Sequence, residues 1–163
     1  MNNKVVLAFS GGLDTSFCVP YLKEKGYEVH TVMVNTGGFS AEEEKAIETR
    51  ALTLGAASHK NVNAVETYYS KGIRYLIYGN ILKNATYPLS VSSERVFQAL
   101  EVLRHVKEIG AGAVAHGSTG AGNDQVRFDI VFEILAPEVK IIAPVRDEGF
   151  TRQFEIDFLQ KHG

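Results

Sequence analysis

Residues 4–16 have the sequence KVVLAFSGGLDTS, and this stretch decides the fold. Residues 4–9 form a compact apolar run with β-branched side chains, which is typical of a buried strand. Ser10, Gly11 and Gly12 end the run, and a helical stretch rich in hydroxyl groups follows them. A buried strand that turns directly into a helix predicts the first half of a strand–helix–strand unit.

The same alternation continues along the chain. We expect further strands at residues 29–34, 59–62, 113–116 and 139–143. Helical patterns separate them, except that residues 79–91 are predicted to form a long loop before a helix that begins at Ser92 or Ser93. Five strands separated by helices imply parallel pairing through right-handed crossovers. The sequence therefore predicts an α/β fold, a doubly wound, mainly parallel five-stranded sheet with helices on both faces.

Composition limits the classes of protein to consider. The chain has 163 residues, of which 45% are hydrophobic and 22% charged, so it is globular and the size of one domain. A net charge of −2 without a long run of Lys or Arg argues against nucleic acid or a membrane surface as the main partner. Cys18 is the only cysteine, which excludes an intrachain disulfide. No stretch resembles a signal peptide or a membrane span, so we expect a cytoplasmic enzyme or binding domain.

Three loops with small or polar residues follow predicted strands. They are residues 10–16, 35–39 and 116–124. In doubly wound sheets, ligands bind beyond the carboxyl ends of the strands. We therefore expect these loops to face one crevice, and this crevice is the candidate site.

The first of these loops is suited to an anion. Glycines let backbone N–H groups approach a phosphate, and the helix that follows adds unpaired amides and the positive end of its dipole. Ser10, Thr15 and Ser16 offer hydroxyl donors. The alternative is a tight strand-to-helix turn capped by Asp14 or Thr15. The loop is not a Walker A motif, because no Gly-Lys-Ser or Gly-Lys-Thr follows.

As a whole, the heptad SGGLDTS at residues 10–16 resembles the pyrophosphate-binding loop (PP-loop) of the ATP pyrophosphatase superfamily, whose fold is adenine nucleotide alpha hydrolase-like. Members of that superfamily attack the α-phosphate of ATP and release pyrophosphate. The resemblance implies an ATP site formed by Ala8, Phe9, Ser10, Gly11, Gly12, Leu13, Asp14, Thr15 and Ser16. It also implies Mg²⁺ as a cofactor, with Asp14 as a candidate ligand and a helix-capping role for Asp14 as the rival interpretation.

The loop at residues 116–128 has the sequence HGSTGAGNDQVRF. Its three glycines allow a ligand to approach the backbone closely. Arg127 offers a bidentate fork for a carboxylate, and Asp124 is suited to hold an amine. A flexible turn with an ordinary helix cap and a solvated arginine is the alternative. His116 is expected to be a packing residue at a strand end rather than a base.

This second stretch is similar, nearly residue for residue, to a motif of the argininosuccinate synthase family. The similarity implies that Gly117 contacts ATP, that Thr119, Asn123 and Asp124 bind aspartate, and that Asn123 and Arg127 bind citrulline. Val34, after the second strand, is implied as an adenine contact.

The segment at residues 87–95, YPLSVSSER, falls where the family has a further citrulline-binding stretch. Tyr87 and Ser92 match the citrulline-binding positions. Pro88, Ser90, Val91 and Glu94 depart from the commoner pattern, which leaves open a relative that uses another amide or ureido substrate.

The resemblance implies an ATP-dependent carbon–nitrogen ligase of arginine biosynthesis. Such an enzyme joins citrulline and aspartate to argininosuccinate through citrullyl-AMP and releases AMP and pyrophosphate. Residues 1–163 would be its nucleotide-binding domain, and family members continue into a synthetase and multimerisation domain and form homotetramers. This chain alone is expected to be monomeric and inactive. The alternatives are another PP-loop adenylating enzyme and a non-catalytic nucleotide-binding module.

Overall fold

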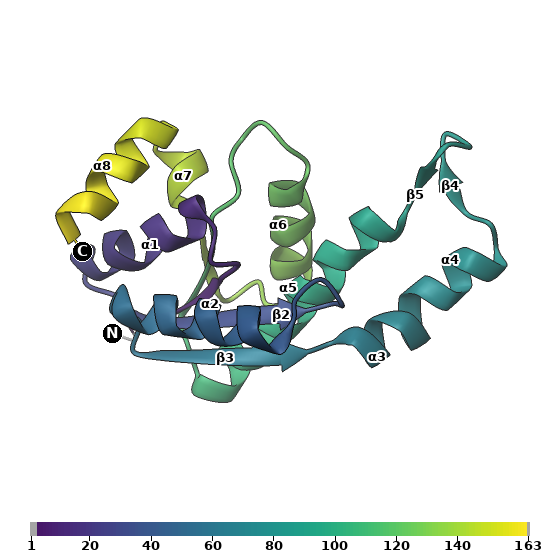
Figure 1. The fold of residues 1–163 in the computed structure, drawn as a ribbon, viewed down its shortest axis with the longest axis horizontal. Coiled ribbons are helices and arrows are strands. Elements are labelled where there is room, and N and C mark those ends of the chain that lie inside the picture. Colours follow the sequence, from purple (N-terminus) through teal and green to yellow (C-terminus); the bar gives the residue numbers. More distant parts are fainter. Residues whose placement is uncertain (1–2, 163) are drawn as a thin grey trace.

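The computed structural model describes residues 3–162, apart from the side chain of Lys83, and confirms the predicted sheet. Its strands are β1 (Lys4–Ala8), β2 (Glu28–Asn35), β3 (Ser58–Asn63), β6 (Ala113–His116) and β7 (Lys140–Ile142). They lie in the order β3-β2-β1-β6-β7, and every pairing is parallel. The central strand β1 therefore has a neighbour on each side, and the PP-loop leaves the sheet from its middle (Figure 1).

Helices cover both faces of the sheet (Figure 1). The long helices are α1 (Leu13–Glu24), α2 (Ala41–Thr53), α5 (Ser90–Ile109), α6 (Asp124–Leu135) and α8 (Arg152–His162). Val5 and Leu7 of β1 pack in the core that contains residues of α1, α2 and α8, whereas Val6 packs with α5 and α6. This alternation follows from the two-residue period of a strand and makes the fold doubly wound, as predicted.

A group of aromatic rings fastens α8 to α1. The ring of Phe17 lies 5.1 Å from that of Phe158, 6.0 Å from that of Phe154 and 5.2 Å from that of Phe150, each in an edge-to-face arrangement. Such pairs add about 0.5–1.5 kcal/mol each beyond the burial of their area. The final helix is thus held beside the helix that begins at the PP-loop.

Residues 79–91 differ from the prediction of a long loop. They contain an antiparallel hairpin of β4 (Leu82–Lys83) and β5 (Tyr87–Pro88), and α5 already begins at Ser90. Asn84 and Ala85 take positive φ values of 54° and 57° in the turn. The hairpin was not predicted, because glycine, which usually marks such a turn in a sequence, is absent at both positions.

In the segment before the hairpin, the sequence pattern predicts one helix that Asn63 caps and that runs through Tyr75. It is instead divided into α3 (Val65–Tyr68), the π-helical η1 (Tyr69–Ile73) and α4 (Arg74–Tyr78). Together with the hairpin, these elements form an arm that projects from the sheet (Figure 1). A short helix that the sequence did not predict, α7 (Pro144–Asp147), follows β7.

Candidate functional site

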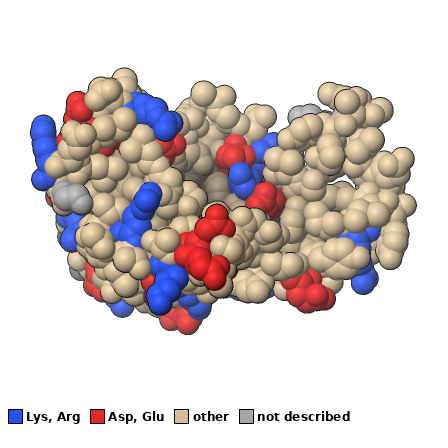
Figure 2. Space-filling view, in the orientation of Figure 1, with Lys and Arg blue, Asp and Glu red and all other residues tan. Residues whose placement is uncertain are grey.

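A cavity of about 580 Å³ lies at the carboxyl ends of β1, β2 and β6. The three predicted loops meet there, since Ser10 and residues 12–15, 38–39 and 116–118 contribute to its wall. Figure 2 shows the molecule hollowed at this place, with acidic and basic side chains at the margin. The expected convergence of the loops on one crevice is confirmed.

The PP-loop presents the start of α1 to this cavity. Gly12, which has no side chain, is the N-cap residue of α1, whereas Asp14 and Thr15 lie inside the helix, so neither of them takes the N-cap position considered for it. The first amides of a helix have no partner within the helix and are left for an anion. Ser10 Oγ and Thr15 Oγ1 lie 3.3 Å apart beside them. The loop therefore offers amide and hydroxyl donors in one place.

The back of this loop is braced by α2. The Arg50 guanidinium donates to the carbonyl oxygen of Gly11 at 2.7 Å. Gly11 has a φ of +74°, and a Cβ there would lie 3.0 Å from Ile47 Cγ1. The hydrogen bond directs the Gly11 carbonyl toward α2, and Gly11 itself does not line the cavity. Sequence reasoning missed Arg50, because only the fold brings residue 50 to the loop.

The two glycine loops also touch each other. A Cβ on Gly117 would lie 3.0 Å from both the backbone N and Cγ2 of Thr15. A side chain there would push the Thr15 backbone back by a few tenths of an ångström, so glycine favours this approach, which closes the cavity between β1 and β6.

His116 supports the second loop from below. The Ser118 N–H donates to His116 Nδ1 at 3.2 Å, so the ring proton is on Nε2, which donates to Asp129 Oδ1 at 2.9 Å. Asp129 also pairs with Arg146. Burial lowers the pKa of His116 despite the carboxylate beside it, which keeps the ring neutral near pH 7. These bonds agree with the packing role expected for His116.

The N-terminal turn of α6 joins that of α5 through charged contacts. Arg127 donates to Ser92 Oγ at 3.1 Å and pairs with Asp124, and Arg95 Nε donates to Asp124 Oδ2 at 3.1 Å. Asp124 and Arg95 line the cavity, whereas Arg127 and Ser92 lie behind them. Three of the predicted amino-acid-binding residues, Ser92, Asp124 and Arg127, are therefore in direct contact.

The other predicted amino-acid-binding residues are less close to the cavity. Tyr87 belongs to β5 in the arm, with about half of its side chain exposed. Thr119 lies in the second glycine loop, and Asn123 is the N-cap residue of α6. Among the described residues that line the cavity, Tyr87, Thr119 and Asn123 are absent.

The predicted nucleotide-binding residues lie at the cavity with two exceptions. Those that line it are Ala8, Phe9, Ser10, Gly12, Leu13, Asp14, Thr15, Val34 and Gly117. Gly11 faces α2, and Ser16 is buried with its hydroxyl directed at the Gly11 carbonyl, 3.4 Å away. Most of the predicted nucleotide-binding residues therefore line the cavity, and Gly11 and Ser16 lie behind its wall.

Glu94 also lines the cavity, although the sequence marked it only as a departure from the family pattern. Its Oε1 accepts hydrogen bonds from Thr36 Oγ1 at 2.6 Å and from Gln98 Nε2 at 3.1 Å. These bonds tie the loop after β2 to α5. The spacing of Glu94 and Gln98, one helical turn, was the signal available in the sequence.

Helix α8 adds two residues that the sequence did not single out. Arg152 lines the cavity, and Glu155 is 2% exposed. Burial, followed by the charge of Asp14, raises the pKa of Glu155 to about 7. Glu155 Oε2 has no hydrogen-bond partner. Two carboxyl groups therefore adjoin at the start of α1, and no cluster of three metal-ligating side chains occurs within residues 3–162.

The chain is similar to proteins of known classification. The model of the arginosuccinate synthase N-terminal HUP domain matches residues 4–163. The argininosuccinate synthase of Xanthomonas campestris is 44% identical over 98% of this chain and 41% of that protein. The enzyme of Pyrobaculum aerophilum is 44% identical over 99% of the chain and 40% of its own length. The chain thus spans about two fifths of the curated relatives it matches.

Solved structures share the fold at low identity. A 4-thiouridine synthetase in complex with RNA and ATP gives a TM-score of 0.73 at 18% identity, over 99% of this chain and 41% of that one. A predicted subunit of a tRNA methyltransferase from Methanocaldococcus jannaschii gives 0.61 at 20% identity, over 96% and 74%. None of the helices within residues 3–162 has the length and apolar character needed to span a bilayer.

Proposed function

Because this chain belongs to the argininosuccinate synthase family, we propose that it forms the ATP-binding part of a ligase that joins citrulline and aspartate. The observation that carries the proposal is the contact between Gly117 and Thr15 beside the uncapped start of α1. It brings a phosphate-binding loop and a loop with paired charged residues to one cavity. We expect ATP to occupy that cavity.

In the proposed complex, the phosphates of ATP lie against the PP-loop. The free amides at the start of α1 and the hydroxyls of Ser10 and Thr15 are the donors. The adenine lies beside Val34 and Ala8, which are cavity-lining residues at the ends of adjacent strands. This arrangement fixes the α-phosphate between the two glycine loops.

The proposed reaction has two steps. The ureido oxygen of citrulline attacks the α-phosphorus of ATP, and the bond to the bridging oxygen of pyrophosphate breaks, giving citrullyl-AMP. The aspartate amine then attacks the ureido carbon, AMP leaves and the amine loses a proton. The contribution of the protein is to position the reactants and to stabilise developing charge.

The cluster of Ser92, Asp124 and Arg127 is the proposed amino-acid site, flanked by Tyr87, Thr119 and Asn123. The guanidinium of Arg127 suits the citrulline carboxylate, and the Asp124 carboxylate suits the ammonium group of aspartate. Their mutual contacts hold both side chains in place before substrates arrive. The positive charge of Arg127 and the negative charge of Asp124 are thus complementary to the charged groups of the two amino-acid substrates.

Mg²⁺ is the metal that this phosphate chemistry calls for. The oxygen donor set of the cavity fits it, because Asp14 lines the wall next to the PP-loop. Mg²⁺ is usually held by one or two carboxylates together with phosphate oxygens and water, so a full cage of protein ligands is not required. We propose Asp14 as the ligand; the bound ion would spread the charge of the leaving pyrophosphate.

We further propose that residues 1–163 are the nucleotide-binding domain of a longer protein, with a second domain that supplies further citrulline contacts and assembles a homotetramer. The chain alone would then bind ATP but release little pyrophosphate, because one wall of the citrulline pocket would be open to water. Loss of positioning can cost roughly 7–11 kcal/mol of barrier.

Calorimetry with Mg-ATP tests the assignment of the cavity. Gly12 lines it and has a φ of −73°, so Gly12→Val adds a side chain without backbone strain and fills the path of the phosphates. Saturable binding by the parent chain that falls at least tenfold in Gly12→Val, with an unchanged melting temperature, is the expected result. Equal affinities would overturn the assignment.

A further inference from the structure

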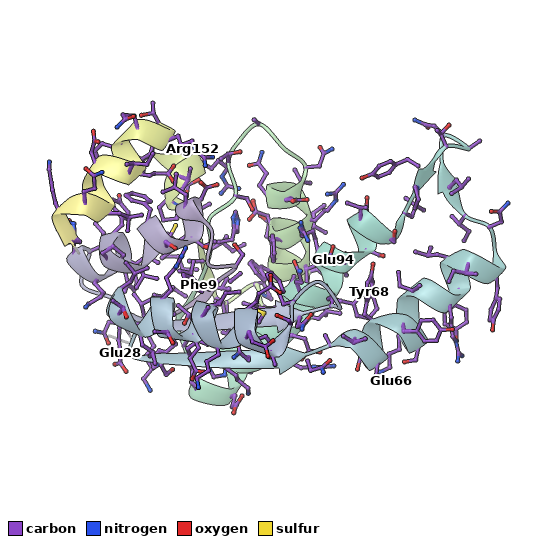
Figure 3. The ribbon with its side chains drawn as sticks, viewed as in Figure 1. Phe9, Glu28, Glu66, Tyr68, Glu94 and Arg152 are labelled. Carbon is purple, nitrogen blue, oxygen red and sulfur yellow. The ribbon has the colours of Figure 1, made fainter. Side chains whose placement is uncertain are left out.

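Arg152 stands out because it is the first residue of α8 and lines the same cavity as the PP-loop. Helices α8 and α7 both lie against α1, and Figure 3 shows Arg152 at the end of α8 that adjoins α7. Among the described residues of the cavity wall, Arg95 and Arg152 are the two arginines, and no lysine is present.

These two arginines have different surroundings. Arg95 pairs with Asp124 at 3.1 Å and with Glu94 at 3.2 Å, so its charge is already balanced. Within residues 3–162, no carboxylate lies within 4.0 Å of the Arg152 guanidinium. Its side chain is exposed to the solvent that fills the cavity. Arg152 therefore has its donors available for a ligand.

The backbone of Arg152 is held firmly. The preceding residue, Thr151, accepts hydrogen bonds from the amides of Phe154 and Glu155 at 3.3 and 3.1 Å. Phe154 and Phe158 pack on Phe17 of α1. These contacts fix the helix against α1, so the backbone that carries the Arg152 side chain lies beside the first turn of α1.

The position of Glu155 shows which side of α8 faces the start of α1. It lies three residues after Arg152, so both side chains project from one side of the helix. The buried carboxyl of Glu155 interacts with Asp14 in the first turn of α1 and with Arg152. Arg152 is therefore next to the helix turn whose amides face the phosphates.

The cavity wall carries negative charges, so a cation such as Arg152 is needed to bind a further anion. Asp14, Glu94 and Asp124 all line the cavity, and a nucleoside triphosphate brings several further negative charges. We propose that Arg152 binds the β- and γ-phosphates of ATP and then the pyrophosphate as it leaves. When the bond from the α-phosphorus to the bridging oxygen breaks, the electron pair stays on the pyrophosphate, where a bidentate guanidinium stabilises it. This inference rests on the proposed function.

The experiment compares ligands that differ in these phosphates. Calorimetry measures ATP, inorganic pyrophosphate and AMP binding to the parent chain, to Arg152→Ala and to Arg152→Lys. In Arg152→Ala we expect the affinity for ATP and for pyrophosphate to fall about tenfold, or about 1.4 kcal/mol. The affinity for AMP should not change, and Arg152→Lys should recover part of the loss. Lys161→Ala is the matched control, because it removes an exposed cation from the other end of α8.

Each other outcome has a distinct meaning. A parent chain that binds no ATP overturns the proposed function and this inference with it. Normal ATP binding by the parent chain and an equal affinity in Arg152→Ala overturn only the inference. A loss that is as large for AMP as for ATP assigns Arg152 a structural role and also overturns it. Melting temperatures of all variants show whether the fold is intact.

Discussion

The two glycine loops of the cavity are built differently. The PP-loop is fixed from behind by the hydrogen bond from Arg50 to the Gly11 carbonyl and by the contact with Ile47. The second loop arches away from the sheet between β6 and α6 (Figure 1). A Cβ on Gly122 would meet nothing within 4 Å, and the Gln125 side chain is what ties the Gly120 and Gly122 carbonyls.

The difference suggests a division of tasks. A phosphate group is the same in every nucleotide, so a rigid loop can be preorganised for it at no cost during binding. A loop with few contacts can adjust when an amino acid arrives and can exclude water once it is seated. We therefore expect substitutions in and against the PP-loop, including Gly117, to act on stability and nucleotide binding, and those in the open part of the second loop to act on amino-acid use.

The largest effect is expected from the buried carboxyl of Glu155, which packs behind the PP-loop. Its pKa in the folded chain is about 7, against an ordinary value of 4.5, so the folded state binds the proton more tightly than the unfolded state. The stabilisation is therefore present below about pH 4.5 and is lost as the pH rises through 7, by up to about 3 kcal/mol. Glu155→Gln should remove this dependence.

Urea unfolding between pH 5 and pH 9 measures how the free energy of unfolding depends on pH. Glu133→Gln, which changes an exposed carboxyl of α6, is the control and should follow the parent chain. Parallel stability curves for the parent chain and Glu155→Gln would show that the carboxyl ionises freely in the folded state.

A pair of equal substitutions compares the part of the second loop that touches the PP-loop with its open part. In Gly117→Ala the new methyl group lies 3.0 Å from the Thr15 backbone, so we expect a loss of about 1–3 kcal/mol of unfolding free energy together with weaker ATP binding. In Gly122→Ala, with open space around the methyl group, the change should stay within about 0.5 kcal/mol. Similar losses in both variants would contradict the contrast between the part of the second loop packed on the PP-loop and its open part.

The prediction for Asp124 concerns amino-acid use. In the complete enzyme proposed above, Asp124→Ala should lower kcat/KM for aspartate about tenfold or more, through the loss of charge-assisted hydrogen bonds. ATP binding should change little, because the PP-loop is intact. Asp124→Asn, which keeps the size of the side chain, separates charge from packing. Unchanged aspartate kinetics together with weakened ATP binding would show that Asp124 serves the fold.

The sequence predicted the parts of this molecule that are encoded locally. All five strands were placed within one or two residues, because apolar β-branched runs end at glycines or polar residues. The capping box at the start of α2 is local too, since Ser40 and Glu43, three residues apart, are bonded to each other's backbone amides. Membership of the argininosuccinate synthase family followed from the two glycine loops.

What the sequence did not reveal depends on contacts between distant segments. Arg50 reaches Gly11 from another helix, and Arg152 and Glu155 reach the start of α1 from the end of the chain. In the sequence they are ordinary charged residues of amphipathic helices, and only the packed fold shows which of them is buried. The hairpin at residues 82–88 was missed for a local reason, since its turn contains Asn84 and Ala85 instead of glycine.

The contact between Gly117 and Thr15 limits how this site can vary over evolution. A smaller residue at position 15 would relieve the clash with Cγ2, but the second close atom is a backbone nitrogen, which every residue has. No exchange of side chains at position 15 therefore makes room for a Cβ at position 117. A lineage can depart from glycine there only if the Thr15 backbone gives way by a few tenths of an ångström, so changes in the two loops are coupled.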